Sequence, residues 1–454
     1  MGNVKGQRLL PRREFLRLGG TGLAALGLGS VLASCGGGGG SGGQELEMWW
    51  WGEQEAPGLK DWLNESIGQY EKKSGNTIKT TLQDTTDVVA GFQRAAAAQN
   101  APDIAFLWNG IYHMESVWQG YLEPLNGLIP EDLLKSSNAT ALSIFEGKQY
   151  RLGWYAVPLL WVYNKQMFDR VGLDADAPPQ TWDDFLAACD KLKGEGITPI
   201  TGGLKDGPWG EWWMGQALSQ NLESPADAIS LFIGDLNWNE PRYYEQWSRL
   251  EEVWKADYIN KDINSIDLYP GIDLFGAGKG AMTLIAGPLV PDMQSKLGAE
   301  NVGVMVFPVW GQGAMAGRPI RDTQGLGISS QSDYKEEAAD FLQFLHSEER
   351  VNALWDQVSQ LPADTTWDGS VIDDPTIKQI WQEWMHGDSI PYISNLMPVL
   401  FWTDAMFVNS QKIIAGEYTG EEAGANAEEV SRKWREQNPD FVENYKTWQK
   451  DLKL

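Results

Sequence analysis

ELEMWWWGEQEAPGLKDWLNESIGQYEKKSGNTIKTTLQ, residues 45–83, carries the clearest structural signal in the chain. It opens with a short apolar run, ELEMWW, and closes with a second short run, NTIKTTLQ. Between them, from residue 59, apolar residues recur every three or four positions up to Gly75. These periods predict a strand, an amphipathic helix that stops at the glycine, and another strand. Strands that alternate with helices indicate parallel pairing and an α/β class.

The same alternation continues beyond this segment. DVVAGFQRAAAAQN at 87–100 predicts a second helix, and DIAFLW at 103–108 predicts a third strand. From about residue 336 the period is mostly helical. A chain of 454 residues exceeds one comfortable hydrophobic core, so we expect two lobes.

Polar and aromatic residues follow each of the three predicted strands. WGEQE at 51–55, QDTTD at 83–87 with Asp84, and WNG at 108–110 each carry an indole, a carboxylate or an amide. Parallel sheets bind ligands beyond the carboxyl ends of their strands. The sequence therefore predicts that these three segments share a binding site.

The three consecutive tryptophans of the first strand have different expected positions. Side chains alternate along a strand, so Trp49 and Trp51 point to one face and Trp50 to the other. Trp51 is last before the turn, and we expect it and Glu53 to contact ligand. Replacing either should weaken binding and leave folding largely intact, whereas Trp49 and Trp50 should carry stability. Glu53 and Glu55, at the same strand end, each fit a solvated surface or the site equally well.

The N-terminus is typical of an export signal. PRREFLRL at 11–18 contains a twin-arginine pair, and a glycine-spaced apolar stretch runs from there to Ser34. That stretch is a poor span for a hydrocarbon core ~30 Å thick. We therefore expect residues 1–34 to be a cleaved signal peptide of the twin-arginine type.

A lipid anchor is expected directly after the signal. LASC at 32–35 resembles the bacterial lipoprotein box, which implies that Cys35 receives diacylglycerol and further acyl groups such as palmitate. GGGGGSGGQ at 36–44 then predicts a flexible tether that spans ~16 Å. The protein would sit at the outer face of the cytoplasmic membrane, held by lipid.

Charge and cysteine content exclude several functions. The net charge is −26, and it becomes −30 without residues 1–34, so nucleic acid is not an expected partner. Cys189 is the only cysteine besides Cys35, and it shares a helical face with Trp182 and Phe185, which predicts a core thiol and no disulfide between body residues.

No motif for a metal, a cofactor or a nucleophile is present. The three histidines are scattered without ligand spacing, and no GxSxG elbow occurs. FGAGKGAM at 275–282 lacks the Ser or Thr that follows the lysine of a phosphate-binding loop. The many carboxylates leave a surface glycoside hydrolase or lyase open as an alternative, because the separation of an acid pair is not a property of sequence.

Several segments in a fixed order resemble the extracellular solute-binding proteins of ABC importers, in the carbohydrate-binding family that includes maltose-binding protein. They are APDIAFLW at 101–108, GYLEPL at 120–125, GKQY at 147–150, VYNKQMFDRVGL at 162–173, PPQTWDDF at 178–185, FGAGKGAM at 275–282, AGP at 286–288, GLGISS at 325–330, AADFLQFL at 338–345 and LPA at 361–363.

This resemblance implies a two-lobe α/β fold of the type II periplasmic-binding-protein class, with hinge segments near 155–160, 320–326 and 363–366. Each lobe would be a sheet flanked by helices. The implied lobes are residues 45–155 with 325–363 and residues 160–320 with 366–454.

The implied function is transport and not catalysis. A monomer would bind a mono- or oligosaccharide in an aromatic cleft and deliver it to the transmembrane subunits of an ABC permease with its ATPase. A pyranose has an apolar face that stacks on indole and a hydroxyl rim that needs polar partners when buried. A non-sugar ligand, a polyol phosphate or a peptide, stays open as an alternative.

The resemblance also implies sugar-binding residues. Carried over by position, they are Trp108 with Asn109, Trp209 with Glu211 and Trp212, and Trp402 with Asp404.

The sequence departs from the family pattern at two places. Leu289 stands where the family has a stacking tryptophan, and Trp154 and Tyr155 occupy a loop that usually carries proline and small polar residues. We infer that stacking has moved toward the hinge, and we include Trp154, Tyr155 and Asp322 among the expected site residues. Five tryptophans at helical apolar spacing are expected to pack instead: Trp62, Trp182, Trp247, Trp254 and Trp434.

Overall fold

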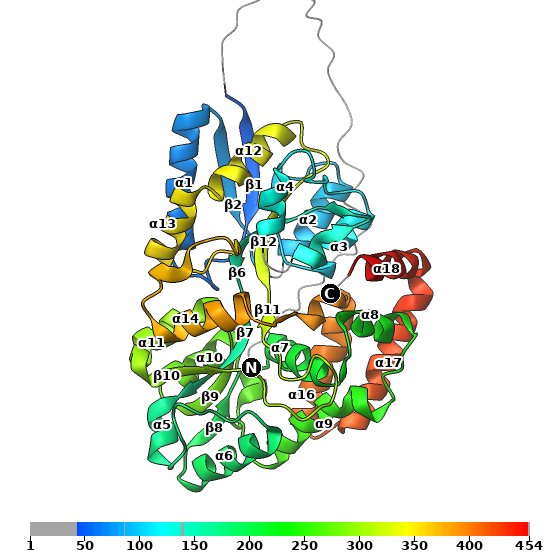
Figure 1. Cartoon of the computed structure of the whole chain (residues 1–454). Coiled ribbons are helices and arrows are strands. Elements are labelled where there is room, and N and C mark those ends of the chain that lie inside the picture. Colours follow the sequence, from blue (N-terminus) through cyan, green and yellow to red (C-terminus); the bar gives the residue numbers. More distant parts are fainter. Residues whose placement is uncertain (1–42, 86, 138–139, 453–454) are drawn as a thin grey trace, which may run out of the picture. The chain divides into compact units, whose positions relative to one another are not determined.

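The computed structural model describes residues 43–85, 87–137 and 140–452 (Figure 1). The expected signal peptide, the acylated Cys35 and most of the tether lie outside these ranges. Gln44, at the end of the expected tether, already belongs to the folded body, because its N–H donates to the Asn76 side chain at 2.9 Å. No helix in the described ranges is long and apolar enough to cross a membrane.

The N-terminal strand–helix–strand unit is confirmed. β1 (Glu45–Trp50) and β2 (Thr77–Leu82) are parallel and paired along their whole length, and α1 (Leu59–Ser74) connects them. The helix buries one apolar face and ends where Gly75 adopts a left-handed conformation with φ 80°, from which its N–H donates to Glu71 O.

The first sheet has the strand order β2-β1-β3-β12-β6. β3 (Ile104–Leu107) is parallel to β1, as predicted, but β12 (Thr323–Ile328) is antiparallel to both β3 and β6 (Leu152–Ala156). The sheet is therefore mixed and not purely parallel. β12 follows β11 of the second sheet with only Asp322 between them, and it begins beside the carboxyl end of β3. It therefore runs in the direction opposite to β3.

The second sheet has the order β13-β11-β7-β9-β8, with β10 paired to β7. It is also mixed, since β8 and β9 are parallel whereas β7 and β9 are antiparallel. Its strands are β7 (Leu159–Asn164), β8 (Thr198–Thr201), β9 (Gly280–Ala286), β10 (Val302–Met305), β11 (Ile320–Arg321) and β13 (Ile390–Pro391).

Two very short connections join the sheets. Only Val157 and Pro158 separate β6 from β7, and only Asp322 separates β11 from β12. The two connections are bonded to each other, because Val157 N–H donates to Asp322 O at 2.8 Å.

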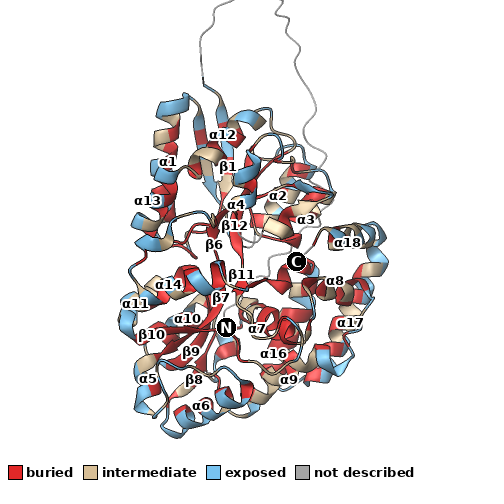
Figure 2. Cartoon of the chain, viewed as in Figure 1, coloured by how far each residue is buried: buried red, intermediate tan, exposed pale blue. Residues whose placement is uncertain are grey.

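Helices surround both sheets, and Figure 2 shows mostly buried strands, although β1 and β2 carry exposed positions. Near the first sheet in Figure 1 lie α1, α2 (Val88–Ala97), α3 (Ile111–Trp118), α4 (Glu131–Ser136), α12 (Lys335–Leu345) and α13 (Glu348–Val358), with a small hairpin of β4 (Ile144–Phe145) and β5 (Lys148–Gln149). Near the second lie α5 (Lys165–Arg170), α6 (Trp182–Gly194), α7 (Pro208–Ala217), α8 (Pro225–Ile233), α9 (Pro241–Lys255), α10 (Leu268–Gly276) and α11 (Val290–Leu297).

The C-terminal region is mostly helical, as predicted, apart from the short strand β13. It contains α14 (Pro375–Ile380), α15 (Val399–Phe401), α16 (Val408–Ile414), α17 (Gly420–Gln437) and α18 (Pro439–Asp451), together with π-helical turns at Trp381–Met385 and Trp402–Phe407.

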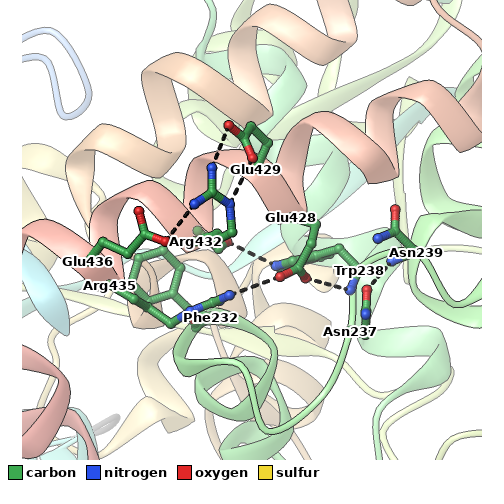
Figure 3. Close-up of polar contacts among 10 residues, drawn as sticks. Phe232, Asn237, Trp238, Asn239, Glu428, Glu429, Arg432, Arg435 and Glu436 are labelled. Carbon is green, nitrogen blue, oxygen red and sulfur yellow. Dashed lines mark hydrogen bonds and ion pairs between the residues drawn. The ribbon is translucent and has the colours of Figure 1, made fainter.

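The Arg435 guanidinium on α17 forms hydrogen bonds that connect this helix to the C-terminal end of α8 (Figure 3). Arg435 donates to Phe232 O and to the Glu428 carboxylate, both at 2.9 Å. Glu428 in turn accepts the N–H of Trp238, whose indole donates to Ser431 at 3.1 Å.

α18 packs against helices that lie near different sheets. It contacts α8 and α17. The rings of Phe441 and Tyr445 also lie 5.5 and 4.9 Å from the ring of Trp118 on α3.

Most predictions about core residues hold. Cys189 is a fully buried free thiol on α6. Of the five tryptophans expected to pack, Trp254 is only partly buried, though it still packs against the core, and the others are buried.

Candidate ligand-binding site

Asp322 lies at the centre of a buried polar cluster where the two sheets meet. Its carboxylate accepts the side-chain amide N–H of Asn109 at 2.8 Å, that of Asn395 at 2.7 Å, and the N–H of Thr323 at 2.8 Å. Asn109 follows β3, and Asn395 belongs to a 3₁₀ turn 73 residues further along the chain than Asp322. Burial raises the pKa of Asp322, and Arg151 partly opposes that rise.

Glu55 is a second buried carboxyl of this region, at the end of β1. Its Oε2 accepts the hydroxyl of Tyr155 at 3.0 Å and the amide of Gln324 at 2.9 Å. Burial raises its pKa from 4.5 to about 7. The turn before it requires glycine, since Gly52 has φ 132° and an added Cβ would lie 2.5 Å from the Tyr155 hydroxyl.

Glu211 is a third buried carboxyl, in the first turn of α7. Burial raises its pKa from 4.5 to about 8, and the hydroxyls of Ser394 and Tyr392 oppose that rise. Its Oε1 has no hydrogen-bond partner. The charge of Asp322 raises the pKa of both Glu211 and Glu55, so Asp322 interacts with each of these two carboxyls.

Aromatic rings run alongside these carboxyls. The ring of Tyr112, in the first turn of α3, lies 4.1 Å from that of Trp402 and 5.5 Å from that of Trp108. Trp108 lies in turn 5.4 Å from Trp51. Trp402 is only partly buried, and its indole N–H donates to Ser394 O at 3.3 Å. Stacking surface and hydrogen-bonding groups thus occur together.

Four buried polar atoms of this region form no hydrogen bond: Tyr112 OH, Trp209 Nε1, Glu211 Oε1 and Ser394 Oγ. Each belongs to a side chain no more than 3% exposed. Buried polar groups in folded proteins are nearly always paired, and leaving one unpaired costs about 1–3 kcal/mol. A ligand rich in hydrogen-bonding groups would remove this cost.

Most sequence-predicted site residues lie in or beside the cluster. Trp51, Trp108 and Trp402 belong to the run of aromatic rings. Asn109 donates a hydrogen bond to Asp322. Tyr155 donates to Glu55, and Glu211 is affected by the charge of Asp322.

Two of the predicted tryptophans present their faces to protein. Trp209 stacks on Trp213 with ring centroids 5.7 Å apart, and an added Cβ on Gly202 would lie 2.5 Å from its Nε1. Trp154 lies 5.9 Å from Trp62 and 5.5 Å from Tyr155. Both side chains are buried.

Glu53 has a structural partner that the sequence did not indicate. Its carboxylate accepts the N–H of Gly58 at 3.0 Å and of Lys60 at 2.6 Å, so it caps the N-terminus of α1. Its neighbour Trp49 is partly exposed, and its indole donates to Glu47 at 2.7 Å.

Three further predicted residues form no described hydrogen bond with the carboxyls of the cluster. Asp84 and Asp404 are exposed and Trp212 is partly buried. Asp404 accepts the Thr403 hydroxyl at 2.8 Å. Among the hydrogen bonds of residues 43–85, 87–137 and 140–452, none links these three to Asp322, Glu55 or Glu211.

Several members of the cluster were missed from sequence. Tyr112 falls one helical turn after Trp108, a spacing that could have indicated it. Tyr392 and Asn395 lie in a stretch without any period, and no pattern connects them to a strand end nearly 300 residues earlier. Within the described ranges, no group of three His, Cys, Asp or Glu side chains is placed to hold a metal ion.

Sequence comparisons match extracellular binding proteins. Residues 56–351 match the family model described as bacterial extracellular solute-binding protein. An uncharacterized ABC transporter extracellular-binding protein of Pyrococcus horikoshii is 26% identical over 271 residues, 57% of this chain and 60% of that protein. The diacetylchitobiose binding protein of Streptomyces coelicolor is 28% identical over 127 residues, 28% of this chain and 29% of that protein. The chain thus spans less than two thirds of the length of either relative.

Solved structures share the fold over almost their whole length. A chitin oligosaccharide binding protein gives a TM-score of 0.74 at 21% identity, covering 86% of this chain and 98% of that one. The maltose/maltodextrin-binding domain of Bdellovibrio bacteriovorus, bound to maltotriose, gives 0.68 at 20% identity, covering 86% and 100%. The expected fold class, a two-lobe α/β fold of the type II periplasmic-binding-protein kind, is confirmed. Because the family model also matches more than half of the sequence, this chain belongs to the family of bacterial extracellular solute-binding proteins.

Proposed function

We propose that this chain is the receptor of an ABC importer and that it binds a mono- or oligosaccharide at the Asp322 cluster. The observation that carries the proposal is the meeting of three buried carboxyls, unpaired buried polar atoms and a run of aromatic rings at the junction of the two sheets. Sugar hydroxyls would bond to the polar groups, and the apolar sugar face would stack on the rings.

Trp402 is the best placed stacking residue. It is partly exposed, whereas Tyr112 beside it is buried. The rings of Trp209 and Trp154 pack against other tryptophan rings. These two residues would therefore stabilise the protein around the site and would not stack on sugar. This assignment refines the set of platforms expected from the family.

Ligand capture would use a hinge at the two short connections. Asp322 is itself the connection between β11 and β12, and Val157 bonds to it. Rotation of the two lobes about this point would open and close the site. The lobes would be residues 45–155 with 325–363 and residues 160–320 with 366–454, with α18 bridging them at one side.

The cellular setting of the proposal follows from family and sequence together. A relative at 26% identity is named as an ABC transporter extracellular-binding protein. We propose that acylated Cys35 anchors the protein outside the cytoplasmic membrane, that a twin-arginine signal exports it, and that a monomer delivers sugar to permease subunits.

A panel of neutral, amino and acidic sugars, followed by tryptophan fluorescence and thermal unfolding, tests the proposal. At least one saccharide should quench or shift the fluorescence and raise Tm. Trp402→Ala should abolish that response, and Trp49→Ala, which removes a partly exposed indole outside the cluster, should leave it unchanged. Silence across the panel would reject a carbohydrate ligand. Turnover of a chromogenic glycan, lost in Glu211→Gln, would instead favour the hydrolase.

A further inference from the structure

The C-terminal helix α18 contacts segments of both proposed lobes. It packs against α8 and α17, which fall in the lobe of residues 160–320 with 366–454. It also packs against β4 and against Trp118 of α3, which fall in the lobe of residues 45–155 with 325–363. The helix thus joins the two lobes at a place other than the short connections between the sheets.

α18 lies apart from the proposed hinge. Figure 1 shows it at the right edge of the folded body, whereas β6, β7, β11 and β12 lie near the middle. Trp118 is the last residue of α3, about 9 Å along the helix from Tyr112 of the Asp322 cluster. Rotation displaces atoms in proportion to their distance from the axis. When the lobes rotate, α18 therefore has to give up its contacts with one of them.

Hydrogen bonds attach α18 to the lobe that contains α8. Gln449 donates to Ala226 O and to the Ser230 hydroxyl, both at 2.9 Å. The ring of Tyr445 lies 5.7 Å from that of Phe232, which is also on α8. A single residue separates α18 from α17. These connections would keep α18 with this lobe when the cleft opens.

Ring packing joins α18 to the other lobe. Three rings of α18 lie 5.5, 4.9 and 6.1 Å from the ring of Trp118: those of Phe441, Tyr445 and Trp448. Near the end of the helix, the Asp451 carboxylate accepts the backbone N–H of Glu146 at 2.6 Å. Glu146 is exposed, in the turn between β4 and β5, so water competes for this bond. The contact around Trp118 is therefore the one that would separate.

This aromatic contact buries polar groups without pairing them. Tyr445 OH, Trp448 Nε1 and Trp118 Nε1 are buried and form no hydrogen bond. Each group would gain a hydrogen bond to water if the rings separated, which lowers the cost of separation. Burial of the rings favours the contact. The two effects oppose each other, which suits a contact that forms and breaks reversibly.

We propose that α18 is a latch for the cleft: Trp118 packs on Phe441, Tyr445 and Trp448 when the lobes close and leaves them when the lobes open. The inference rests on the hinge of the proposed function and adds an element outside the ligand site that stabilises the closed form. A ligand held between the lobes requires that form, so the latch raises the apparent affinity by raising the closed population.

Small-angle X-ray scattering of the ligand-free protein tests the latch in two ways, and the first removes the contact. The radius of gyration of a compact body of about 410 residues is ~22 Å. Where the unaltered protein is closed, Trp118→Ala should raise this radius by roughly 1 Å. Trp254→Ala truncates another partly buried tryptophan, on α9 within one lobe, and should leave the radius unchanged. Circular dichroism checks that both variants are folded.

The second way fixes the contact. Glu146→Cys with Asp451→Cys, in a Cys35→Ser background, places one cysteine on each side of it, and the remaining Cys189 is fully buried. Where the unaltered protein is open, the disulfide-linked form should have a radius of gyration roughly 1 Å smaller than the reduced form. Mass spectrometry verifies the cross-link.

A change of radius in either experiment supports the latch. If Trp118→Ala leaves the radius unchanged, and the linked and reduced forms also agree, α18 does not control the lobes and the inference is wrong. A cysteine pair that does not cross-link on oxidation would count against the contact itself. If Trp118→Ala fails to fold, Trp118→Leu, which keeps an apolar side chain, takes its place. Neither measurement contains sugar, so failure to bind any sugar would reject the proposed function and leave the latch to be judged separately.

Discussion

The Asp322 carboxylate accepts a hydrogen bond from Asn395 at 2.7 Å and another from Asn109 at 2.8 Å. Asp322 lies between β11 and β12, so its side chain connects this junction to two segments distant in the sequence. Asp322→Ala should therefore lower the free energy of unfolding by about 1–3 kcal/mol, because both buried amides lose their acceptor. It should also weaken ligand binding. Urea unfolding and sugar titration measure the two effects, with Glu195→Ala at an exposed position as the control. Unchanged stability would show that the amides find other partners.

Trp51 should matter more for stability than Trp49. Its indole is 5% exposed, packs against Phe106 and Trp108, and donates to Thr85 at 2.9 Å, whereas Trp49 is partly exposed. Trp51→Ala should cost about 3–5 kcal/mol, and Trp49→Ala about 0.5 kcal/mol or less. From the sequence alone we predicted that loss of Trp49 or Trp50 would destabilise the protein and that loss of Trp51 would leave folding largely intact. A larger cost for Trp49→Ala than for Trp51→Ala in chemical denaturation would support the prediction from sequence instead.

Glu53→Ala should destabilise the protein by about 0.5–2 kcal/mol and leave ligand affinity unchanged, because its carboxylate caps α1 and is not part of the Asp322 cluster. Exposed Gln54→Ala serves as the matched control and should have no effect. Calorimetric melting and ligand titration of both variants check this. Loss of sugar binding with normal stability would instead support the binding role predicted for Glu53 from sequence.

Stability should fall as pH rises from about 6.5 to about 8. Burial raises the pKa of Glu55 from 4.5 to about 7 and that of Glu211 to about 8, so over this window the folded protein holds protons that the unfolded chain has released. The free energy of unfolding then decreases with pH, since the folded state binds more protons. Below about pH 6.5, His113 and His346, whose pKa values burial lowers to about 3 and about 4, act in the opposite direction.

Glu55→Gln and Glu211→Gln identify the source of this pH dependence. Each should flatten the decline in the unfolding free energy measured by urea titration at several pH values. Glu195→Gln, at an exposed position, should leave the slope unchanged. A slope that is the same in all three variants would place the titrating groups elsewhere.

Local sequence determined much of the architecture. Periodicity alone predicted the first three strands, the first two helices, the stop at Gly75 and the burial of Cys189, because each depends on residues close in the chain or on one apolar face. The ordered family segments led to the correct fold class. Strand ends also led to residues of the candidate site, since Asn109 bonds to Asp322 and the ring of Trp108 lies 5.4 Å from that of Trp51.

Tertiary structure decided which of these side chains meet and in what state. Glu53 and Glu55 are two residues apart in similar contexts, yet one caps a helix and the other is buried with Tyr155 and Gln324. The sequence around them does not distinguish them, because the partners that bury Glu55 lie on strands 100 and 269 residues further along the chain. The raised pKa of Glu211 likewise depends on burial by distant segments, a property that exists only once the chain has folded.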